Sequence, residues 1–282
     1  MLTLATRRRR RRLVALVALM LLVVAAIVVK WVVLNDDVHR LTTEEAVDRY
    51  RDGTSTTMTT GTDGTQPVTT DTTSSPVEQT LPAPGVYVYS TRGKESIDAV
   101  GGSLHEYPAE TTITVTASEC GVSLQWDALK ERRERWQLCL GEEGIVVTAD
   151  GGQSFHEFFG QTKTEDLTCD RDVVVVPADG MSREPVALTC MLADLPWQPV
   201  WEVLESDTQL VDGELVELVH VRMTISDNDE YYEHIQLDWM LDARGLPVTA
   251  TMLKENLSDT AFGDVRYLEE YRLEITSLVP LR

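Results

Sequence analysis

Residues 215–241 read LVELVHVRMTISDNDEYYEHIQLDWML. Apolar and polar side chains alternate in both halves of this stretch, and the turn-forming run SDND separates the halves. Alternation with a period of two is typical of a strand with one buried face, and the separating run favours a tight connection. The stretch therefore predicts an antiparallel β-hairpin with arms Leu215–Ile225 and Glu233–Leu241.

Each arm of this hairpin has one apolar and one polar face. Because successive side chains of a strand point to opposite sides, His220, His234 and Asp238 share the polar face. A turn centred on Asp227 places His220 nearly opposite His234, which makes these groups a candidate metal or acid–base cluster. The alternative is a pair of solvated surface histidines, and two ligands with one carboxylate do not complete a closed site, so we expect no metal and no cofactor. The face predicted for the core holds Val219, Val221, Met223, Ile225, Ile235, Leu237, Trp239 and Leu241.

The same alternation recurs from Gly85 to the C-terminus, about 200 residues, which is long enough for one substantial core. Connections such as Asp242–Gly245 suit hairpins, so the pattern predicts a mainly β (β-rich α+β) domain with an antiparallel sheet over residues 85–282. Few short helices are expected: one at Ser154–Gln161, and one at Trp126–Arg135, which reads equally well as a charged loop between two strands. Further strands are predicted at Val86–Ser90, Thr112–Ala117, Val122–Trp126, Val173–Val176, Val248–Leu253 and Tyr271–Leu278.

The N-terminal region indicates a membrane anchor. Residues 13–34 are apolar except for Lys30, and a helix of about 20 such residues crosses ~30 Å of hydrocarbon. An arginine-rich tail, residues 1–12, precedes this stretch and Asp36 follows it, so we expect a single-pass plasma membrane protein with a cytoplasmic N-terminus and an extracytoplasmic C-terminal domain. The alternative is a cleaved signal and a secreted domain. The charges that set this orientation are Arg7, Arg8, Arg9, Arg10, Arg11 and Arg12.

Two segments separate the predicted anchor from the predicted exported domain. Residues 35–52 form a juxtamembrane segment in which Thr42 and Glu45 make a capping box, which predicts a short helix over Thr43–Tyr50. Residues 53–84 are rich in Thr, Ser, Gly and Pro and contain few large apolar side chains, so we expect a disordered linker that tethers the domain.

The charge balance excludes one class of partner. The chain carries 25 basic and 46 acidic side chains, and the segment up to Leu34 holds seven of the basic ones and none of the acidic ones, which leaves −28 from Asn35 onward. Nucleic acids are bound by Lys and Arg that neutralise phosphate, so nucleic acid is not an expected partner. The excess of arginine over lysine hints at a GC-rich bacterial source.

Four cysteines, all in the predicted exported part, indicate two disulfide bonds. Four cysteines allow three connectivities, but Cys120–Trp126 and Arg135–Leu140 read as the arms of a strand–turn–strand unit, where cross-strand Cα atoms lie within bridging distance. We therefore expect neighbouring cysteines to pair. A zinc site is the alternative, although no C-x-x-C spacing is present. The expected bonds are Cys120–Cys139 and Cys169–Cys190.

No catalytic motif is complete, so no enzymatic role is expected. His156 and Glu157 begin like H-E-x-x-H, but Gly160 stands where the second histidine is needed. The residues around Ser154 lack the closing glycine of G-x-S-x-G. A wall hydrolase acting through two carboxylates in a cleft is a further hypothesis. Adjacent carboxylates such as Glu142–Glu143 and Glu269–Glu270 are expected from the acidic composition, and we interpret them as solvated faces.

The segment from Leu237 to Val248, LDWMLDARGLPV, resembles a hairpin of the lipoprotein-carrier superfamily, which includes LolA, RseB-like and LppX/LprG-like proteins. In these proteins a strand ends in Asp, a turn with Gly follows, and the next strand opens with Leu and Pro. The resemblance covers mainly the C-terminal hairpins. It implies a curved half-barrel sheet whose concave apolar face receives an acyl chain or a lipoprotein, and it identifies no single ligand-binding residue.

These features together predict a membrane-anchored extracytoplasmic binding module of the cell envelope. Its partners are the lipid bilayer, through residues 13–34, and a lipid or apolar ligand of the exported domain. The alternative is a structural or accessory envelope protein whose acidic domain binds another protein.

Overall fold

The computed structural model describes residues 38–57, 79–98, 102–158, 161–192, 195–225, 232–260 and 263–282. Within these ranges the chain forms one helix, α2 (Thr43–Thr57), and eighteen strands, which confirms the mainly β prediction. The strands are β1 (Gly85–Ile97), β2 (Ser103–Glu106), β3 (Glu110–Ala117), β4 (Gly121–Asp127), β5 (Arg132–Gly141), β6 (Gly144–Val147), β7 (Gly152–Phe158), β8 (Gln161–Cys169), β9 (Val173–Pro177), β10 (Arg183–Ala187), β11 (Cys190–Leu192), β12 (Leu195–Trp197), β13 (Val200–Val203), β14 (Asp207–Val211), β15 (Glu214–Ile225), β16 (Tyr232–Leu241), β17 (Pro247–Thr260) and β18 (Gly263–Ile275).

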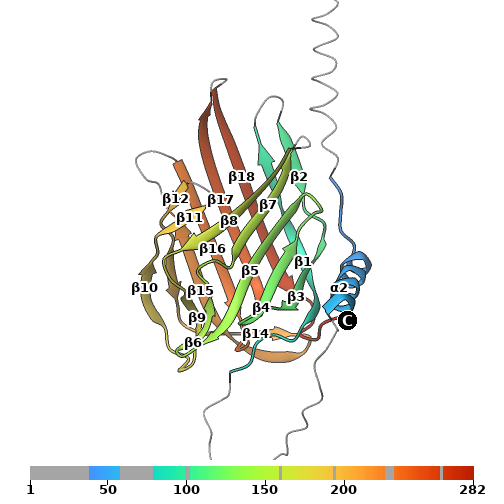
Figure 1. Ribbon diagram of the computed structural model, residues 1–282, viewed down its shortest axis with the longest axis vertical. Helices are drawn as coiled ribbons and strands as arrows, with labels where there is room; N and C mark the ends of the chain where they lie inside the picture. The colour runs from blue at the N-terminus through green and yellow to red at the C-terminus, as the bar shows by residue number, and fades with distance from the viewer. Residues whose placement is uncertain are drawn as a thin grey trace, which may run out of the picture. The chain divides into compact units, whose positions relative to one another are not determined.

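One antiparallel sheet contains these strands, and its two halves meet at β1, which Figure 1 shows on the right of the domain beside α2. On one side β1 pairs with β18, and the sheet continues through β17, β16 and β15 to β13 and β10, which we call the first wing. On the other side β1 pairs with β2 and β3, and the sheet continues through β4 to β5, which pairs with β6 and β7; we call these strands the second wing. Strand β14 extends the first wing alongside β15, and β9 extends the second wing alongside β6.

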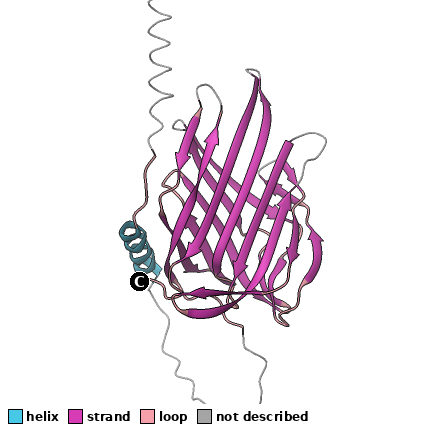
Figure 2. Ribbon diagram, turned by 180° about the vertical axis from the view of Figure 1, so that it is seen from behind, coloured by secondary structure: helices cyan, strands magenta, loops and turns pink. Residues whose placement is uncertain are grey.

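The sheet is curved, so that the inner faces of the two wings enclose the core (Figure 2). The ring of Trp136 on β5 lies 6.2 Å from that of Trp201 on β13 and 5.3 Å from that of Trp239 on β16. Aromatic pairs at such distances and steep angles make favourable edge-to-face contacts. The tryptophans therefore pack one wing against the other.

The hairpin of β15 and β16 has the predicted apolar face. Seven of the eight residues assigned to the core are buried, and Val219 is half-buried. The next turn, Asp242–Gly245, also forms as expected. The Asp242 carboxylate accepts hydrogen bonds from the backbone N–H groups of Arg244 and Leu246, and Gly245 supplies a φ of 84°, which other residues adopt at a cost. The sequence alone predicted the hairpin face and the turn correctly, because each depends on residues that are close together in the chain.

Both predicted helices within the domain are wrong. Ser154 to Phe158 belong to β7, which pairs with the start of β5, and Gln161 begins β8. The Trp126–Arg135 region contains the end of β4, a short turn and the start of β5, in agreement with the alternative of two strands joined by charged residues. Pairing with β5 supplies the backbone hydrogen bonds of β7, and such tertiary pairing overrides local helical periodicity.

Helix α2 begins at the predicted capping box. Thr42 Oγ1 accepts a hydrogen bond from the Glu45 N–H at 3.2 Å, and Glu45 Oε2 accepts one from the Thr42 N–H at 3.0 Å. The buried side chains of Ala46 and Val47 pack with Leu41 and with Val86 of β1. This packing supplies the stability that a helix of 15 residues lacks in isolation.

The residues that precede α2 are also bound to the domain. His39 contacts Glu131 in the β4–β5 turn through both its N–H, at 2.9 Å, and its imidazole Nδ1, at 2.6 Å. The backbone N–H of Lys130 donates to the His39 carbonyl, and Lys130 Nζ donates to Glu45 at 3.0 Å. The predicted juxtamembrane segment is therefore part of the folded domain from Val38 onward.

This docking moves the predicted boundaries. Helix α2 extends through Gly53 to Thr57, so the predicted start of the linker lies inside the helix. The end of the predicted linker is also ordered, because Pro82 is buried and Gln79 Nε2 donates to the Val176 carbonyl at 3.2 Å. The rest of the linker and the predicted anchor, residues 13–34, lie outside the described residues. Among the residues that are described, no helix has the length and apolar character that a membrane span requires.

Both expected disulfide bonds are present. Cys169 and Cys190 lie directly opposite each other on β8 and β11, with their Cα atoms 3.9 Å apart. Cys120 precedes β4 and bonds to Cys139 on β5, with a Cα separation of 5.2 Å. Each bond therefore joins neighbouring chain segments, as the local strand pattern predicted.

Replacing Val47 with Asp places a charge in the contact between α2 and β1, and we expect the helix to leave the sheet. Limited trypsinolysis should then cleave after Arg49 or Arg51 at least about tenfold faster than in the wild type, which corresponds to a loss of about 1.4 kcal/mol of docking energy. The matched control is Asp48→Ala, since Asp48 is exposed on the same helix. Equal cleavage rates in all three proteins would show that the packing of α2 does not hold it in place.

Candidate functional site

A cluster of charged side chains is buried inside the curved sheet. Arg132 at the start of β5 is 1% exposed and forms a two-pronged ion pair with Glu269 on β18, through Nε and Nη2 at 3.0 Å each. Nη2 also donates to Glu134, and Nη1 donates to the Arg133 carbonyl at 2.8 Å. This guanidinium therefore connects the second wing to the first.

Glu95 is the second carboxylate at the centre of the cluster, and it is fully buried on β1. Its Oε1 lies 2.9 Å from His105 Nδ1, and its Oε2 accepts a hydrogen bond from the Tyr267 hydroxyl at 3.0 Å. Oε2 also lies 3.4 Å from His156 Nδ1 and 3.8 Å from Arg132 Nε. Each oxygen of this carboxylate thus has its own set of cationic or hydrogen-bonding neighbours.

Tyrosine hydroxyls complete the bonding of the other carboxylates. Tyr107 donates to Glu269 at 2.6 Å, and Tyr271 donates to Glu134 at 3.3 Å. Burial raises the pKa of Tyr107 and Tyr271 well above the ordinary value, so both remain donors at physiological pH. Buried charges are tolerated only when they are paired and hydrogen-bonded, and this cluster meets both conditions.

The charges of the cluster move the pKa of its members. Burial alone would raise the pKa of Glu95, but the hydrogen bond with His105, the nearby imidazole of His156 and the charge of Arg132 outweigh it and lower that pKa to about 2. The pKa of Glu269 is also lowered; burial opposes the shift, and Arg132 outweighs it. Burial and the charge of Arg132 lower the pKa of His156, which keeps its imidazole neutral near pH 7. The cluster is therefore a set of ionised carboxylates around one guanidinium.

A small pocket of about 50 Å³ adjoins the cluster on the inner face of the sheet. Its polar end is formed by Arg132, Glu134, His156 and Lys254. Lys254 Nζ lies over the rings of Trp197 and Tyr267 at 5.5 and 5.6 Å. Among the described residues Lys254 has no ion-pair partner. The apolar walls are Trp136, Leu167, Leu192, Trp197, Met223, Ile235 and Met252.

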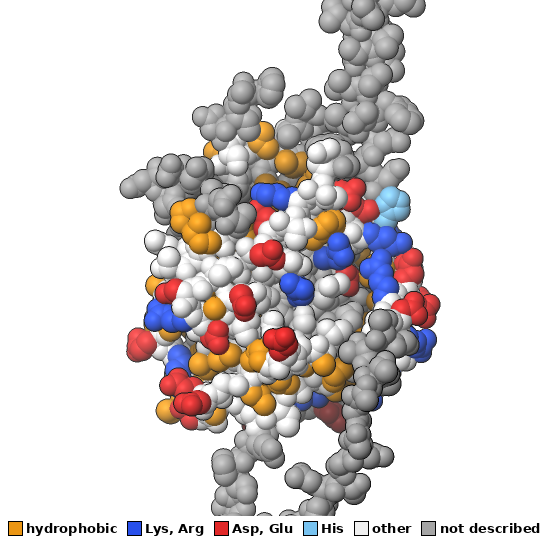
Figure 3. Space-filling model, in the orientation of Figure 1, with side chains coloured by type: hydrophobic (Ala, Val, Ile, Leu, Met, Phe, Trp, Pro, Cys, Tyr) orange, Lys and Arg blue, Asp and Glu red, His pale blue; other side chains and the backbone are white. Residues whose placement is uncertain are grey.

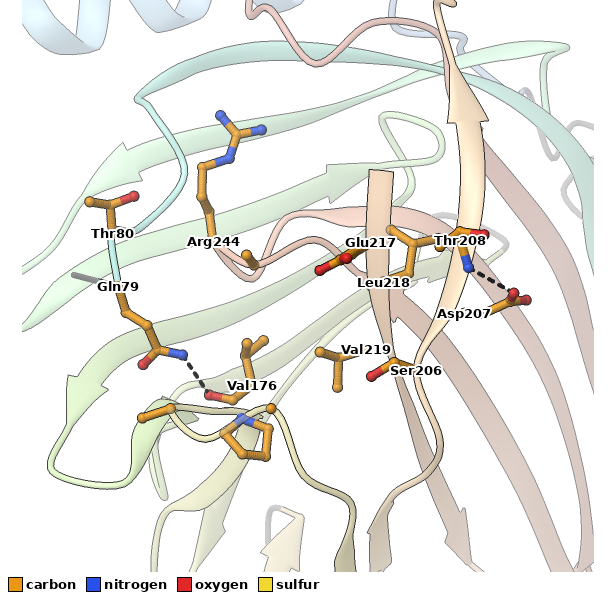
Figure 4. Close-up of a pocket in the computed structure, with 14 residues that line it drawn as sticks. Gln79, Thr80, Val176, Ser206, Asp207, Thr208, Glu217, Leu218, Val219 and Arg244 are labelled. Atoms are coloured by element: carbon orange, nitrogen blue, oxygen red, sulfur yellow. Dashed lines mark hydrogen bonds between the residues drawn. The ribbon is translucent and has the colours of Figure 1, made fainter. Parts of the chain in front are cut away.

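A larger, open groove of about 610 Å³ lies at the other end of the sheet (Figure 4). Gln79 and Thr80 line one side, and Ser206 to Thr208 line the opposite side. Figure 4 shows the side chain of Arg244 between them; its guanidinium is occupied by Asp242, at 2.9 Å from Nε and 2.7 Å from Nη2. Seven of its fourteen lining residues carry polar side chains, and the one cation among those fourteen is already paired. The interior pocket combines apolar walls with a few polar groups, so it is the better candidate site.

The predicted histidine pair does not form. Strands β15 and β16 pair His220 with Met240 and Arg222 with Asp238, so the register differs from the prediction and His234 lies across from Glu255 instead. The predicted register assumed a turn centred on Asp227, whereas the observed pairs are symmetric about residue 230. The connection is therefore longer than the turn residues suggested.

Asp238 contacts His220, as the predicted cluster requires, together with two residues that were not predicted. Its Oδ1 lies 2.6 Å from His220 Nε2 and accepts a hydrogen bond from Arg222 Nε at 2.8 Å. Gln236 donates to its other oxygen at 2.7 Å. Hydrogen bonds from Gln236, His220 and Arg222 lower the pKa of Asp238 against the opposing effect of burial. The described part of the chain contains no group of three metal-ligating side chains that could hold an ion.

The remaining residues singled out from the sequence have clear positions. The four cysteines are bonded in pairs, and Arg7 to Arg12 lie outside the described residues. His156 was noticed only as an incomplete H-E-x-x-H motif, and it contributes to the cluster from a strand. Glu269 was read as a solvated partner of Glu270, but it is fully buried.

Sequence reasoning missed the cluster because its members are far apart in the chain. Arg132 and Glu269 are separated by 137 residues. Residues 132–171 contain four arginines, and residue type alone does not show that Arg132 is the buried one. One local signal was present but was not used. Tyr267, Glu269 and Tyr271 occupy alternate positions, so on a strand they share one face and the carboxylate lies between two aromatic side chains. The predicted strand began only at Tyr271, whereas β18 begins at Gly263. Comparison with known protein families, characterised proteins and solved structures gives no match to this chain.

Replacing Arg132 with Met leaves the buried carboxylates of Glu269 and Glu134 without their cation. We expect the free energy of unfolding to fall by about 3 to 5 kcal/mol, measured by urea denaturation followed through tryptophan fluorescence. Arg135→Met is the matched control, because Arg135 is exposed on the same strand and should change stability by less than about 0.5 kcal/mol. Similar stabilities for the two variants would contradict a structural role for the Arg132 ion pairs.

The lowered pKa values predict that acid destabilises the fold in two stages. The folded pKa of His156 lies below its ordinary 6.5, so its contribution is present above pH 6.5 and is lost as the pH falls below it. The folded pKa of Glu95 is about 2 against an ordinary 4.5, so its contribution is present above pH 4.5 and is lost as the pH falls toward 2. Unfolding curves between pH 7.5 and 3 should show both stages, and His156→Gln should remove the upper one alone. A pH profile unchanged by His156→Gln would assign the upper stage to another group.

Proposed function

We propose that the chain is a membrane-anchored extracytoplasmic binding module whose curved sheet holds an amphiphilic ligand between its wings. The observation that carries the proposal is the interior pocket with apolar walls and a charged end. Binding sites for small ligands combine mainly apolar walls with a few convergent polar groups, and this pocket has both. The resemblance of the Leu237–Val248 hairpin to lipoprotein carriers supports the same class of ligand.

The polar end of the pocket fits an anionic headgroup. Lys254 supplies a positive charge without an ion-pair partner among the described residues, and His156 lies near it. A ligand carboxylate or phosphate beside Lys254 gains a charge-assisted hydrogen bond in a partly desolvated position. The alkyl part of the same ligand then lies along Met252 and Trp197, which are both half-buried. A space of about 50 Å³ holds one or two waters, so these two side chains must move aside for a long chain.

The predicted anchor supports the same proposal, because it would keep the domain close to a source of such ligands. The predicted anchor ends at Leu34, and the folded domain begins at Val38, a distance of at most about 14 Å for a fully extended chain. On this proposal the short connection keeps the domain near the outer leaflet, where amphiphiles are concentrated. Its formal charge of −28 from Asn35 onward repels anionic headgroups at the surface, so selective binding requires the buried cation rather than the exterior.

A second candidate function is the recognition of another protein. Leu210 and Leu215 are paired across the β14–β15 hairpin and are 67% and 72% exposed, beside the open groove. On the face drawn in Figure 3, apolar side chains also gather across the lower part of the domain, below scattered charged groups. Contiguous exposed apolar side chains favour a protein interface.

Photo-crosslinking in membranes tests the lipid proposal. Membranes that contain the full chain are treated with palmitate carrying a diazirine in its alkyl chain, irradiated and digested, and the labelled peptides are identified by mass spectrometry. We expect labels at Leu192–Trp197 and Met252–Lys254, with labelling of residues 13–34 as the internal standard for membrane contact. Met252→Trp fills the pocket and should lower the pocket labels roughly tenfold, because overpacking costs about 1 to 3 kcal/mol.

The matched control is Leu253→Trp, because Leu253 is the next residue of β17 and points to the outer face, where it is 37% exposed. It should leave the pocket labels unchanged. Labels confined to residues 13–34 in every protein would reject the lipid proposal and favour recognition of a protein.

A further inference from the structure

Two arginines of β5 project from the face of the sheet opposite to the buried cluster. Arg132 and Glu134 point into the interior, and successive side chains of a strand alternate, so Arg133 and Arg135 share the outer face. Arg135 is exposed, and Arg133 is half-buried. Positions two residues apart on a strand are separated by about 7 Å, which lets both guanidinium groups reach one small group between them.

Neighbouring strands build a pocket around these arginines. In the pairing of β5 with β7, Arg133 lies directly opposite Phe155, and Arg135 lies directly opposite Gln153. On the other side of β5, Gln125 of β4 lies opposite Arg135. Figure 1 shows β4, β5 and β7 side by side. These side chains enclose about 80 Å³, which we call the outer pocket, and its lining includes Gln125, Arg133, Arg135, Gln153, Phe155 and Thr164.

The guanidinium of Arg133 is held in place but is not fully hydrogen-bonded. Its Cζ atom lies 4.2 Å from the centre of the Phe155 ring, and stacking of this kind fixes the plane of a guanidinium. The Nε atom of Arg133 is buried and has no hydrogen-bond partner among the described residues. A buried donor without an acceptor costs free energy, and native structures contain few of them. This N–H therefore points to an acceptor that the described residues do not supply.

The carboxylates nearest to the outer pocket are bound by amides instead. Gln125 Nε2 donates to both oxygens of Asp127, at 3.0 and 3.3 Å. Gln153 Nε2 donates to Asp166 at 2.6 Å. No ion pair joins either arginine of the outer pocket to the described part of the chain. Two cations of an otherwise very acidic domain thus lie next to each other without an anionic partner.

We infer that the outer pocket binds a carboxylate between Arg133 and Arg135. The two oxygens of a carboxylate match the parallel N–H groups of a guanidinium, and one of them satisfies the buried Nε of Arg133. A carboxylate carries one negative charge, whereas a phosphate monoester carries about −1.5 to −2. The nearby Asp127 and Asp166 and the formal −28 of the domain repel the second charge more strongly, which favours the carboxylate.

The ligand is therefore a small carboxylic acid in its ionised form, or a larger molecule that presents one carboxylate. This site goes beyond the proposed binding of an amphiphile and does not depend on it, because the outer pocket and the interior pocket lie on opposite faces of β5. The other interpretation is that a water satisfies Arg133 Nε and that both arginines only face solvent. That interpretation predicts no retention of a carboxylate at constant ionic strength.

The test uses the full chain in a non-ionic, phosphate-free detergent and acetate labelled with ¹³C at its carboxyl carbon, with sodium chloride holding the ionic strength constant. Binding broadens the acetate signal beyond its width in micelles without protein. We expect excess broadening with the wild type and an affinity at least about tenfold lower in Arg133→Met. Arg133→Lys keeps the charge but loses the fork of N–H groups, so we expect it to lose most of the binding as well.

The matched control is Arg92→Met, because Arg92 is exposed on the outer face of β1 and its removal lowers the net positive charge of that face by the same amount. It should leave the broadening unchanged. Lys254→Met controls for the interior pocket and should also leave it unchanged. The folding of each variant is checked by the trypsin pattern of α2, and if Arg133→Met does not fold, Arg133→Lys provides the comparison.

Three outcomes overturn the inference. The first is a wild-type signal as narrow as that in micelles alone. The second is broadening that persists in Arg133→Met and disappears in Lys254→Met, which would place the acetate in the interior pocket. The third is a ³¹P signal of inorganic phosphate that is broadened more than acetate by the wild type and narrows in Arg133→Met, which would reject the choice of a carboxylate. None of these outcomes changes the lipid crosslinking expected in the interior pocket.

Discussion

The ion pair between Arg132 and Glu269 is the interaction on which the arrangement of the two wings depends. It joins β5 to β18 across the interior, and both side chains are almost entirely removed from water. Desolvating such a pair costs nearly as much as the attraction returns, so its net contribution to stability is small. Its main effect is specificity: any other alignment of the wings leaves at least one charge buried without a partner. Contacts between the apolar tryptophan rings tolerate small shifts of one wing against the other, whereas two parallel hydrogen bonds from one guanidinium do not.

The sequence predicted the local parts of this fold well. The alternation in residues 215–241 identified the buried face of β15 and β16, and Asp242–Gly245 identified the following turn, because each signal lies within a few residues. The cysteine pairs were predictable for the same reason: each bond joins neighbouring chain segments. The wrong predictions concern features that tertiary contacts determine. The strand at Ser154 depends on pairing with β5, and the register of His220 depends on the length of a connection whose turn residues suggested a shorter one.

The candidate site was less predictable than the fold. Its residues come from β1, β2, β5, β7, β17 and β18, and no spacing along the chain connects them. Glu95, Arg132 and Glu269 look like surface charges in so acidic a chain, and only the curvature of the sheet buries them. The outer pocket is nearer to a sequence signal, since Arg133 and Arg135 are two residues apart and share a strand face. The side chains around them are recognised only once the pairing of β5 with β4 and β7 is known.

Helix α2 changes what the threonine-rich segment between Thr57 and Gln79 can do. Both of its ends belong to one folded body, because α2 packs on β1 and Gln79 bonds to Val176. A segment with this connectivity closes a loop, and the free energy of closing a loop varies only slowly with its length. A protease that cuts inside this segment would break the peptide connection between α2 and the sheet, but the noncovalent contacts of α2 would still hold the two parts together. Separation of the two fragments would then proceed at the rate at which α2 dissociates from the sheet, and the two fragments could rebind.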